Sequence, residues 1–80
     1  MYYTYILKSS KSHHFYFGWT TDLPKRVKEH NQGLNQSTKS GIPWILEFYA
    51  AFTTAKQAKD FELYLKSGSG KAFAYKRLLK

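Results

Sequence analysis

The sequence predicts an α+β domain in which helices pack around a small three-stranded antiparallel sheet, in the order β-β-α-β-α-α. Three observations lead to this prediction. Runs rich in β-branched and aromatic residues occur three times, a polar loop joins the first two runs, and apolar residues at helical spacing follow the second and the third. The length predicts a single domain over residues 1–80.

The first two runs are expected to form a hairpin. Tyr2–Lys8 and Phe15–Thr20 are separated by the polar stretch "SSKSHH". If the numbers of opposed residues sum to an odd value, one face of the hairpin carries alternate side chains from both strands. This face then consists of Tyr3, Tyr5, Leu7, Tyr16, Gly18 and Thr20. In this register Gly18 leaves a gap beside Tyr5 and Tyr16, where a ligand can approach closely.

A helix is predicted directly after the hairpin. Asp22 is a suitable N-cap, Pro24 fits the first turn because its missing N–H costs nothing there, and Gly33 suits the left-handed residue that follows a helix. The face expected to pack on the sheet carries Leu23, Val27 and His30.

The rest of the chain predicts a third strand and two further helices. After the polar loop "LNQSTKSGIP", the strand is "WILEFYAAF", which starts after Pro43. Two threonines then offer caps for a second helix over "AKQAKDFELYLKS", which Gly68 is expected to end. A short third helix is predicted over "KAFAYKRLLK".

The composition says more about the partners that the protein can bind than about the reaction that it can catalyse. The chain carries 13 Lys and Arg against 5 Asp and Glu, a net charge of +8, which favours nucleic acid as a partner but also fits an ordinary lysine-rich surface. Without cysteine, disulfides and thiolate metal sites are excluded. The start of the chain is strand-like and no apolar run could span a bilayer, so we expect a cytoplasmic protein with no membrane partner.

Arg26 and His30 are candidates for phosphate chemistry. They are four residues apart on the first predicted helix, so their side chains share a face. The guanidinium matches phosphate oxygens, and an imidazole exchanges a proton near neutral pH. An exposed arginine and a histidine that complements the helix dipole would explain the pair equally well.

Glu62 is a candidate metal ligand. It lies between Ala58 and Leu65 on the apolar stripe of the second predicted helix, where an unpaired carboxylate is costly to bury. One carboxylate with waters and substrate oxygens is the usual way in which proteins hold Mg²⁺. The alternatives are a half-exposed position at the margin of the stripe and a structural pair with a lysine.

Taken in order, these residues resemble a known family. The chain has "YTYIL" in the first strand and "YFG" in the second, an arginine eight residues after that glycine, then "EHN", and a glutamate in a later helix. This series resembles the GIY-YIG nuclease superfamily, most closely its small stand-alone bacterial members, which are similar to the nuclease domain of the excision-repair endonuclease subunit. The first tripeptide reads "YTY" and the second has Phe17 in place of isoleucine.

The resemblance implies roles for the hairpin residues. Tyr5 and Tyr16 match the tyrosines of the two tripeptides, which line the active site in the family. One of them helps to activate the attacking water, and the other orients this water or the scissile phosphate. Gly18 matches the glycine of the second tripeptide.

It also implies roles for three helical residues. Arg26 matches the arginine that contacts the phosphate, where it stabilises the charge of the transition state. His30 falls at a position assigned to proton transfer or phosphate contact. Glu62 matches the carboxylate that holds one divalent ion, Mg²⁺ or Mn²⁺.

The function that this resemblance implies is metal-dependent hydrolysis of DNA phosphodiesters in DNA repair or processing, with RNA as an open alternative. No base-reading module is evident, so we expect cleavage guided by substrate structure or by a protein partner. Candidate contacts to the nucleic-acid backbone are Lys25, Lys28, Lys39, Lys66, Lys71, Lys76 and Arg77. The alternatives are a non-catalytic nucleic-acid-binding module of the same fold and a protein-interaction domain that uses exposed aromatics such as Trp19, Trp44 and Tyr49.

Overall fold

Three antiparallel strands form the sheet of the computed structural model, which describes residues 1–79, and β1 lies between β2 and β3. The strands are β1 Tyr2–Ser9, β2 Phe15–Thr20 and β3 Trp44–Phe52. The helices are α1 Leu23–Asn31, α2 Ala55–Lys66 and α3 Gly68–Phe73, with a 3-10 turn at Lys39–Gly41 and a π-helical turn at Ala74–Leu78. The predicted α+β class and element order are confirmed.

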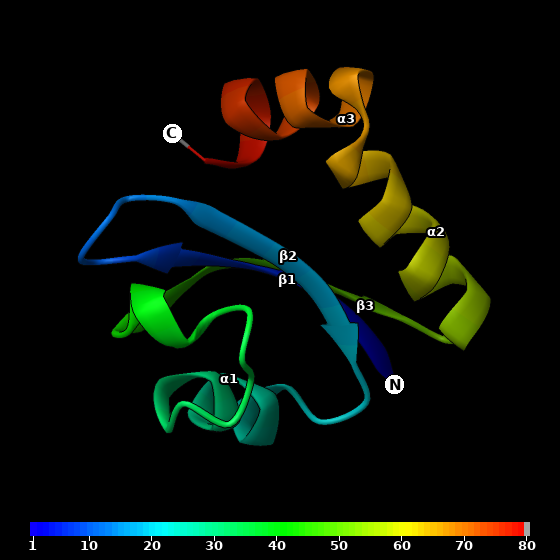
Figure 1. Cartoon of the computed structure of the whole chain (residues 1–80). Helices are drawn as coiled ribbons and strands as arrows, with labels where there is room; N and C mark the ends of the chain where they lie inside the picture. Colours follow the sequence, from blue (N-terminus) through cyan, green and yellow to red (C-terminus); the bar gives the residue numbers. More distant parts are fainter. Residues whose placement is uncertain (80) are drawn as a thin grey trace.

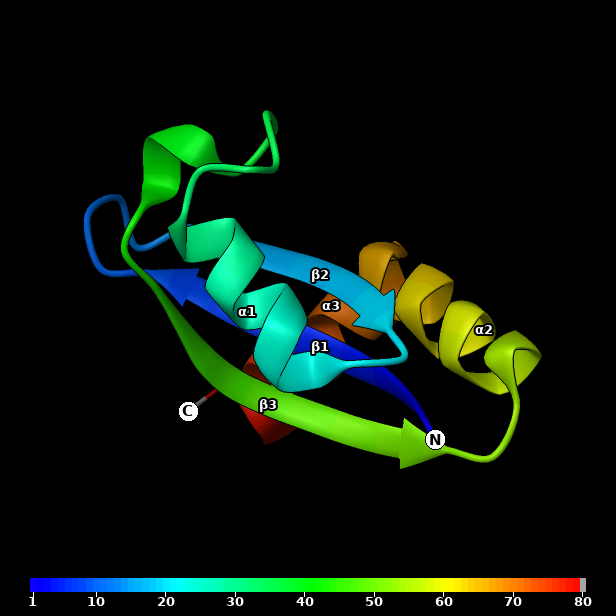
Figure 2. The same cartoon turned by 90° about the horizontal axis from the view of Figure 1, so that it is seen from below.

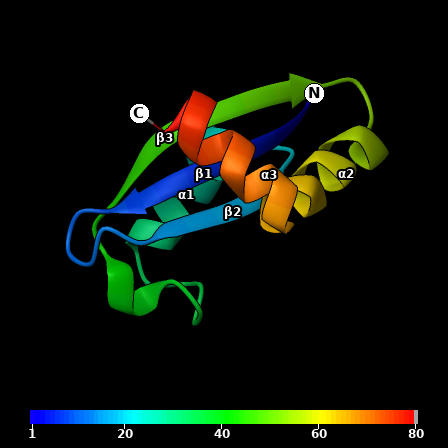
Figure 3. The ribbon, with the colours of Figure 1, turned by 90° about the horizontal axis from the view of Figure 1, so that it is seen from above.

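Helices cover both faces of the sheet. Figure 1 shows α1 below the sheet and α3 above it, with α2 to one side. Figure 2, seen from below, has α1 lying across the strands, whereas Figure 3, seen from above, has α3 there. In both views α2 lies beside the end of β2. The β2 edge of the sheet is therefore the place where elements from the two faces can meet. No helix within residues 1–79 is long and apolar enough to cross a bilayer.

The hairpin has the odd-sum register whose consequences we considered from the sequence. Tyr5 is paired with Gly18 and Leu7 with Tyr16, so the pairs sum to an odd number. An added Cβ at Gly18 would lie 2.6 Å from the hydroxyl oxygen of Tyr5 and 3.1 Å from the Tyr16 ring. The predicted gap at Gly18 is thus filled by the Tyr5 side chain, which leans across β2.

Alternating residues of β1 divide the core into two clusters. Beneath α1, the buried residues are Tyr5, Leu7, Leu23 and Trp44. Beneath α2 and α3, they are Ile6, Phe17, Leu65 and Ala74. The Thr4 hydroxyl also donates to the Ala58 carbonyl over 2.7 Å, which fixes α2 against β1.

Trp44 is not one of the exposed aromatics that the protein-interaction alternative assumed. It is only 8% exposed, and its indole Nε1 donates to the Thr38 carbonyl over 2.7 Å. The indole also lies against Gly41, where a Cβ would collide with it. Its position at the start of a strand did not reveal that the preceding loop folds over the ring. Tyr49, by contrast, is 53% exposed.

The ends of α1 follow the prediction. The Asp22 side chain accepts from the Lys25 N–H at the start of the helix. At the other end Gly33 has a φ of 77°, in the left-handed region that favours glycine. The N–H groups of Gly33 and Leu34 bond to the carbonyls of His30 and Glu29, which is the Schellman arrangement.

The boundary between α2 and α3 differs from the predicted one. We expected α2 to continue through Ser67 and end at Gly68, with the next helix starting at Lys71. Instead Ser67 is extended, with φ −76° and ψ 164°, and its hydroxyl caps α3 by accepting from the Gly70 N–H over 3.1 Å. A Cβ at Gly70 would collide with the Tyr64 carbonyl, so this glycine permits the tight corner between the helices.

Candidate active site

A chain of buried hydrogen bonds lies under α1. Tyr5 is 1% exposed, and its hydroxyl oxygen is 2.9 Å from His30 Nε2. His30 is completely buried, and its Nδ1 is 2.8 Å from Thr38 Oγ1. The Thr38 hydroxyl donates to the Asn35 carbonyl over 3.4 Å, so it is free to accept from His30. This pattern assigns the proton of the neutral imidazole to Nδ1 and leaves Nε2 to accept from Tyr5.

Local structure holds this chain in place. His30 lies in the last turn of α1, on the face that packs against β1. Thr38 comes from the loop between α1 and β3. The Asn31 side chain ties this loop down, because its amide nitrogen donates to the Trp44 carbonyl over 3.0 Å and its oxygen accepts from the Trp44 N–H over 2.6 Å.

Tyr16 covers the hydrogen-bonded pair. Its ring centroid is 5.0 Å from that of His30 and 6.4 Å from that of Tyr5. Tyr16 is half-buried, so it lies between the buried pair and solvent. Gly18, two residues along β2, has no side chain, and the Tyr5 hydroxyl occupies the space over it.

Arg26 lies one helical turn before His30. Its Nη1 donates to Glu29 Oε1 over 3.2 Å, and the side chain is 34% exposed. Interaction with the Tyr5 hydroxyl raises the pKa of the Arg26 guanidinium. Arg26 and Glu29 also line a cavity of about 280 Å³ at the start of α1, together with Thr20, Thr21, Asp22 and Lys25. The guanidinium thus reaches both the buried hydroxyl and an open pocket.

The environment keeps both Tyr5 and His30 uncharged at neutral pH. Burial raises the pKa of Tyr5 to about 12, and Arg26 opposes this shift only in part. Burial also lowers the pKa of His30, and the positive charge of Arg26 lowers it further. The imidazole therefore stays available as a proton acceptor to a lower pH than an exposed histidine would.

Glu62 lies on α2, which packs against β1 and β2. Its side chain is 15% exposed and pairs with Lys66 Nζ over 3.0 Å, the lysine pair that we considered as an alternative. Its negative charge also acts on Tyr5, whose pKa it raises. The structure therefore brings Tyr16, Arg26 and His30 to the Tyr5 side chain and places Glu62 near enough for its charge to affect the pKa of Tyr5, although α1 and α2 pack on the sheet from different sides.

The donor set fits a divalent ion that is held by one carboxylate. Within residues 1–79, no three His, Cys, Asp or Glu side chains gather as a metal cluster. A protein can hold Mg²⁺ by one or two carboxylates when waters and phosphate oxygens complete the shell. Glu62 is a largely buried carboxylate, so its chemistry suits this kind of site.

The predicted backbone contacts do not share one surface. Lys25 and Lys28 belong to α1, whereas Lys71, Lys76 and Arg77 belong to the segment on the opposite face of the sheet. Lys39 lies in the 3-10 turn, and Lys66 is paired with Glu62.

Sequence reasoning missed two residues near the site. Thr38 gave no signal, because it lies in a polar loop. Lys59 lies with its ammonium 5.6 Å from the centroid of the Trp19 ring, and its position three residues before Glu62 could have drawn attention to it.

The sequence profile of the GIY-YIG catalytic domain matches residues 1–76. The chain belongs to the GIY-YIG family. This superfamily is of the nuclease type, and its nucleases generally use divalent metals. Tyr5 and Tyr16, which the resemblance matches to the two tripeptide tyrosines of this family, lie with their ring centroids 6.4 Å apart.

The chain is similar to small proteins named UPF0213. It is 39% identical to UPF0213 protein CPE1444 of Clostridium perfringens over 82% of this chain and 71% of that protein. It is 41% identical to UPF0213 protein YazA of Bacillus subtilis over 78% of this chain and 63% of that protein. The solution NMR structure of UPF0213 protein BH0048 from Bacillus halodurans is 30% identical and has a TM-score of 0.56, over 95% of this chain and 84% of that one.

Proposed function

We propose that this protein is a divalent-metal-dependent endonuclease that hydrolyses phosphodiester bonds of DNA. The observation that supports this most directly is the buried Tyr5–His30–Thr38 hydrogen-bond chain, with the Arg26 guanidinium acting on the Tyr5 hydroxyl and the charge of Glu62 affecting the pKa of Tyr5. A structural core needs none of these polar groups, since burying them is costly unless each finds a partner. Their convergence at Tyr5 suits acid–base work on a phosphate.

The proton path follows from the tautomer of His30. The attacking water loses a proton to the Tyr5 oxygen while the Tyr5 proton moves to His30 Nε2, so Tyr5 stays neutral throughout. A tyrosine with a pKa of about 12 is a poor base on its own. A neutral imidazole with a lowered pKa accepts the proton instead, and Tyr5 relays it. His30 Nε2 is hydrogen-bonded to the Tyr5 hydroxyl, so His30 acts through Tyr5 and not on the phosphate directly.

The phosphate is held and the transition state stabilised by positive charge. Arg26 offers its planar donors to a non-bridging oxygen from the pocket side of α1. A divalent ion held by Glu62, Mg²⁺ or Mn²⁺, would supply further positive charge at the phosphate. As the new P–O bond forms, the bond to the leaving oxygen breaks, and the strand is cut.

We propose that this protein does not select its substrate by base sequence. The net charge of +8 favours binding to the phosphate backbone of any sequence. We therefore place the activity in DNA repair or processing, with the cut position set by DNA structure or by a protein partner.

A nicking assay tests this function. Wild-type protein and variants are incubated with branched, double-stranded and single-stranded DNA, and with matching RNA, in Mg²⁺, Mn²⁺ or chelator. We expect Glu62→Gln and Arg26→Ala to lose about 100-fold or more in rate. Tyr5→Phe is expected to lose rate while DNA affinity stays the same, because it removes the relay and no phosphate contact.

Asp60→Asn is the matched control for Glu62→Gln. Asp60 lies on the same helix and pairs with a lysine in the same spacing, Lys56 to Asp60 over 2.7 Å, but its side chain is 58% exposed. It should cut like the wild type. If Glu62→Gln and Arg26→Ala cut as fast as Asp60→Asn, the proposed mechanism is wrong.

The Glu62–Lys66 ion pair favours one other function. A carboxylate satisfied by a lysine at 3.0 Å is also what a non-catalytic nucleic-acid-binding module of this fold would contain. Such a module would bind DNA equally well with chelator present. In an isothermal titration with Mn²⁺, the wild type and Glu62→Gln would then behave alike, because Glu62 would hold no ion.

A further inference from the structure

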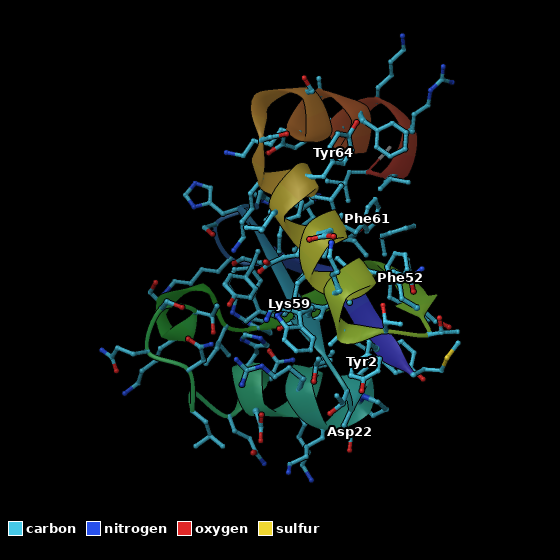
Figure 4. The ribbon with its side chains drawn as sticks, turned by 90° about the vertical axis from the view of Figure 1, so that its right-hand side faces the viewer. Tyr2, Asp22, Phe52, Lys59, Phe61 and Tyr64 are labelled. Carbon is cyan, nitrogen blue, oxygen red and sulfur yellow. The ribbon has the colours of Figure 1, made fainter. Side chains whose placement is uncertain are left out.

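Trp19 and Lys59 form a contact at the β2 edge that neither the proposed chemistry nor the core requires. The Lys59 ammonium lies 5.6 Å from the centroid of the Trp19 ring, within the range of a cation–π interaction. The Tyr2 ring lies on Trp19 as well, with centroids 6.5 Å apart. Figure 4 labels Tyr2, Lys59 and Asp22, and in this view Lys59 lies between α2 and the start of α1.

The Lys59 ammonium keeps its hydrogen-bonding capacity. The other two lysines of α2 are paired with carboxylates, Lys56 with Asp60 and Lys66 with Glu62. Lys59, in contrast, has no acidic side chain of residues 1–79 within 4.0 Å of its ammonium. An aromatic face holds a cation without consuming its three N–H donors. Lys59 is therefore positioned by Trp19 and still able to bind an anion.

The contact lies on the face of the sheet that α2 covers. Trp19 follows Gly18 in β2 and is paired with Thr4, so its side chain lies on the α2 face and not on the face of Tyr5. Lys59 precedes Glu62 by three residues in α2, so these two share a helix face. The Thr4 hydroxyl bond to the Ala58 carbonyl fixes the backbone directly before Lys59. Lys59 thus extends from a rigid point of α2.

We propose that Lys59, held against the Trp19 ring, binds a phosphate group of the DNA strand whose scissile bond lies at Glu62. This inference rests on the proposed function for the direction of the strand, but the phosphate contact itself is a binding property. Lys59 contacts the substrate, and Trp19 is a positioning residue that acts through it.

The salt dependence of DNA binding tests the contact without turnover. Binding of a short fluorescein-labelled DNA is measured by anisotropy at several KCl concentrations, with EDTA present so that no cutting occurs. Loss of one phosphate contact reduces the slope of log K against log salt by about 1. We expect this reduction for Lys59→Gln and for Trp19→Leu, and no reduction for Trp19→Phe, which keeps an aromatic face.

Lys56→Gln is the control, because it removes the same charge from the same helix but from a lysine that is paired with Asp60. If Lys59→Gln and Lys56→Gln have the same slope, the inference is overturned and the Lys59–Trp19 pair serves packing alone. Thermal melting checks that each variant is folded. Should Trp19→Leu fail to fold, Lys59→Gln and Trp19→Phe still decide the question.

The two proposals fail separately. If the wild type cuts DNA in Mg²⁺ but Lys59→Gln leaves the salt slope unchanged, the nuclease function stands and the Lys59 contact does not. If the wild type cuts nothing but the slope falls, the contact stands and the nuclease function does not. A wild type without salt-dependent DNA binding overturns the Lys59 contact, and the nicking assay then decides the nuclease function by itself.

Discussion

Replacing Gly18 by alanine should disturb the packing of Tyr5 in the candidate active site while the rest of the domain stays folded. The Cβ of alanine would lie 2.6 Å from the Tyr5 hydroxyl oxygen and 2.7 Å from the ring carbon that bears it. The backbone of Gly18 is not in the left-handed region, so the added methyl group is strained by lack of space alone.

The size of the effect follows from these distances. An ordinary contact needs at least 3.4 Å, so the Tyr5 hydroxyl has to move by about 0.8 Å. Tyr5 is 1% exposed and cannot move outward freely, so the shift falls on its bond to His30, now 2.9 Å. Overpacking of this kind costs about 1–3 kcal/mol. For 80 residues this lowers Tm by about 6–18 °C.

The cutting rate should fall further than the stability suggests. Moving a reacting group by about 1 Å can cost about 100-fold in rate. The nicking assay is run well below the Tm of the variant, and circular dichroism confirms that it is folded. DNA affinity measured in EDTA should stay near that of the wild type, because no phosphate contact is removed.

Gly68→Ala is the matched control. No atom lies within 4 Å of a Cβ at Gly68, and this residue begins α3. We expect unchanged cutting and a stability change of less than about 1 kcal/mol. If Gly18→Ala melts and cuts like Gly68→Ala, then the Tyr5 hydroxyl does not lie over Gly18, and the proposed proton relay loses its geometric basis.

Two further substitutions test individual contacts. The free energy of unfolding should fall as the pH drops below 6.5, by up to about 1.4 kcal/mol per pH unit. Burial lowers the pKa of His30 in the folded chain, so in this range the unfolded chain binds a proton that the folded chain does not. Urea denaturation between about pH 7.5 and pH 5 measures this, and His30→Gln should lose the decline that comes from this residue; an equal decline in the variant would contradict the assignment. Gly70→Ala should lower Tm more than Gly68→Ala, since its Cβ collides with the Tyr64 carbonyl, and equal melting temperatures would show that the α2–α3 corner relaxes easily.

Most of the fold could be predicted because it depends on local patterns. The alternation in Tyr2–Ser9 and Phe15–Thr20, and the Asp22 and Gly33 signals around α1, act within a few residues along the chain. The corner at Ser67 was misplaced because the choice between two glycines depends on contact with Tyr64, which belongs to the preceding helix.

The sequence by itself determined the three strands, the ends of α1 and which residue types were available for phosphate chemistry, since each follows from spacing and side-chain chemistry. Only the tertiary structure decided that Glu62 and Arg26 both affect the pKa of Tyr5, that His30 is buried behind Tyr5, and that Trp44 belongs to the core. The reason is physical. Which charges act on each other, and which side chains are buried, depends on the faces of the sheet that α1 and α2 cover. No local sequence pattern determines that these two helices meet at the edge of the sheet.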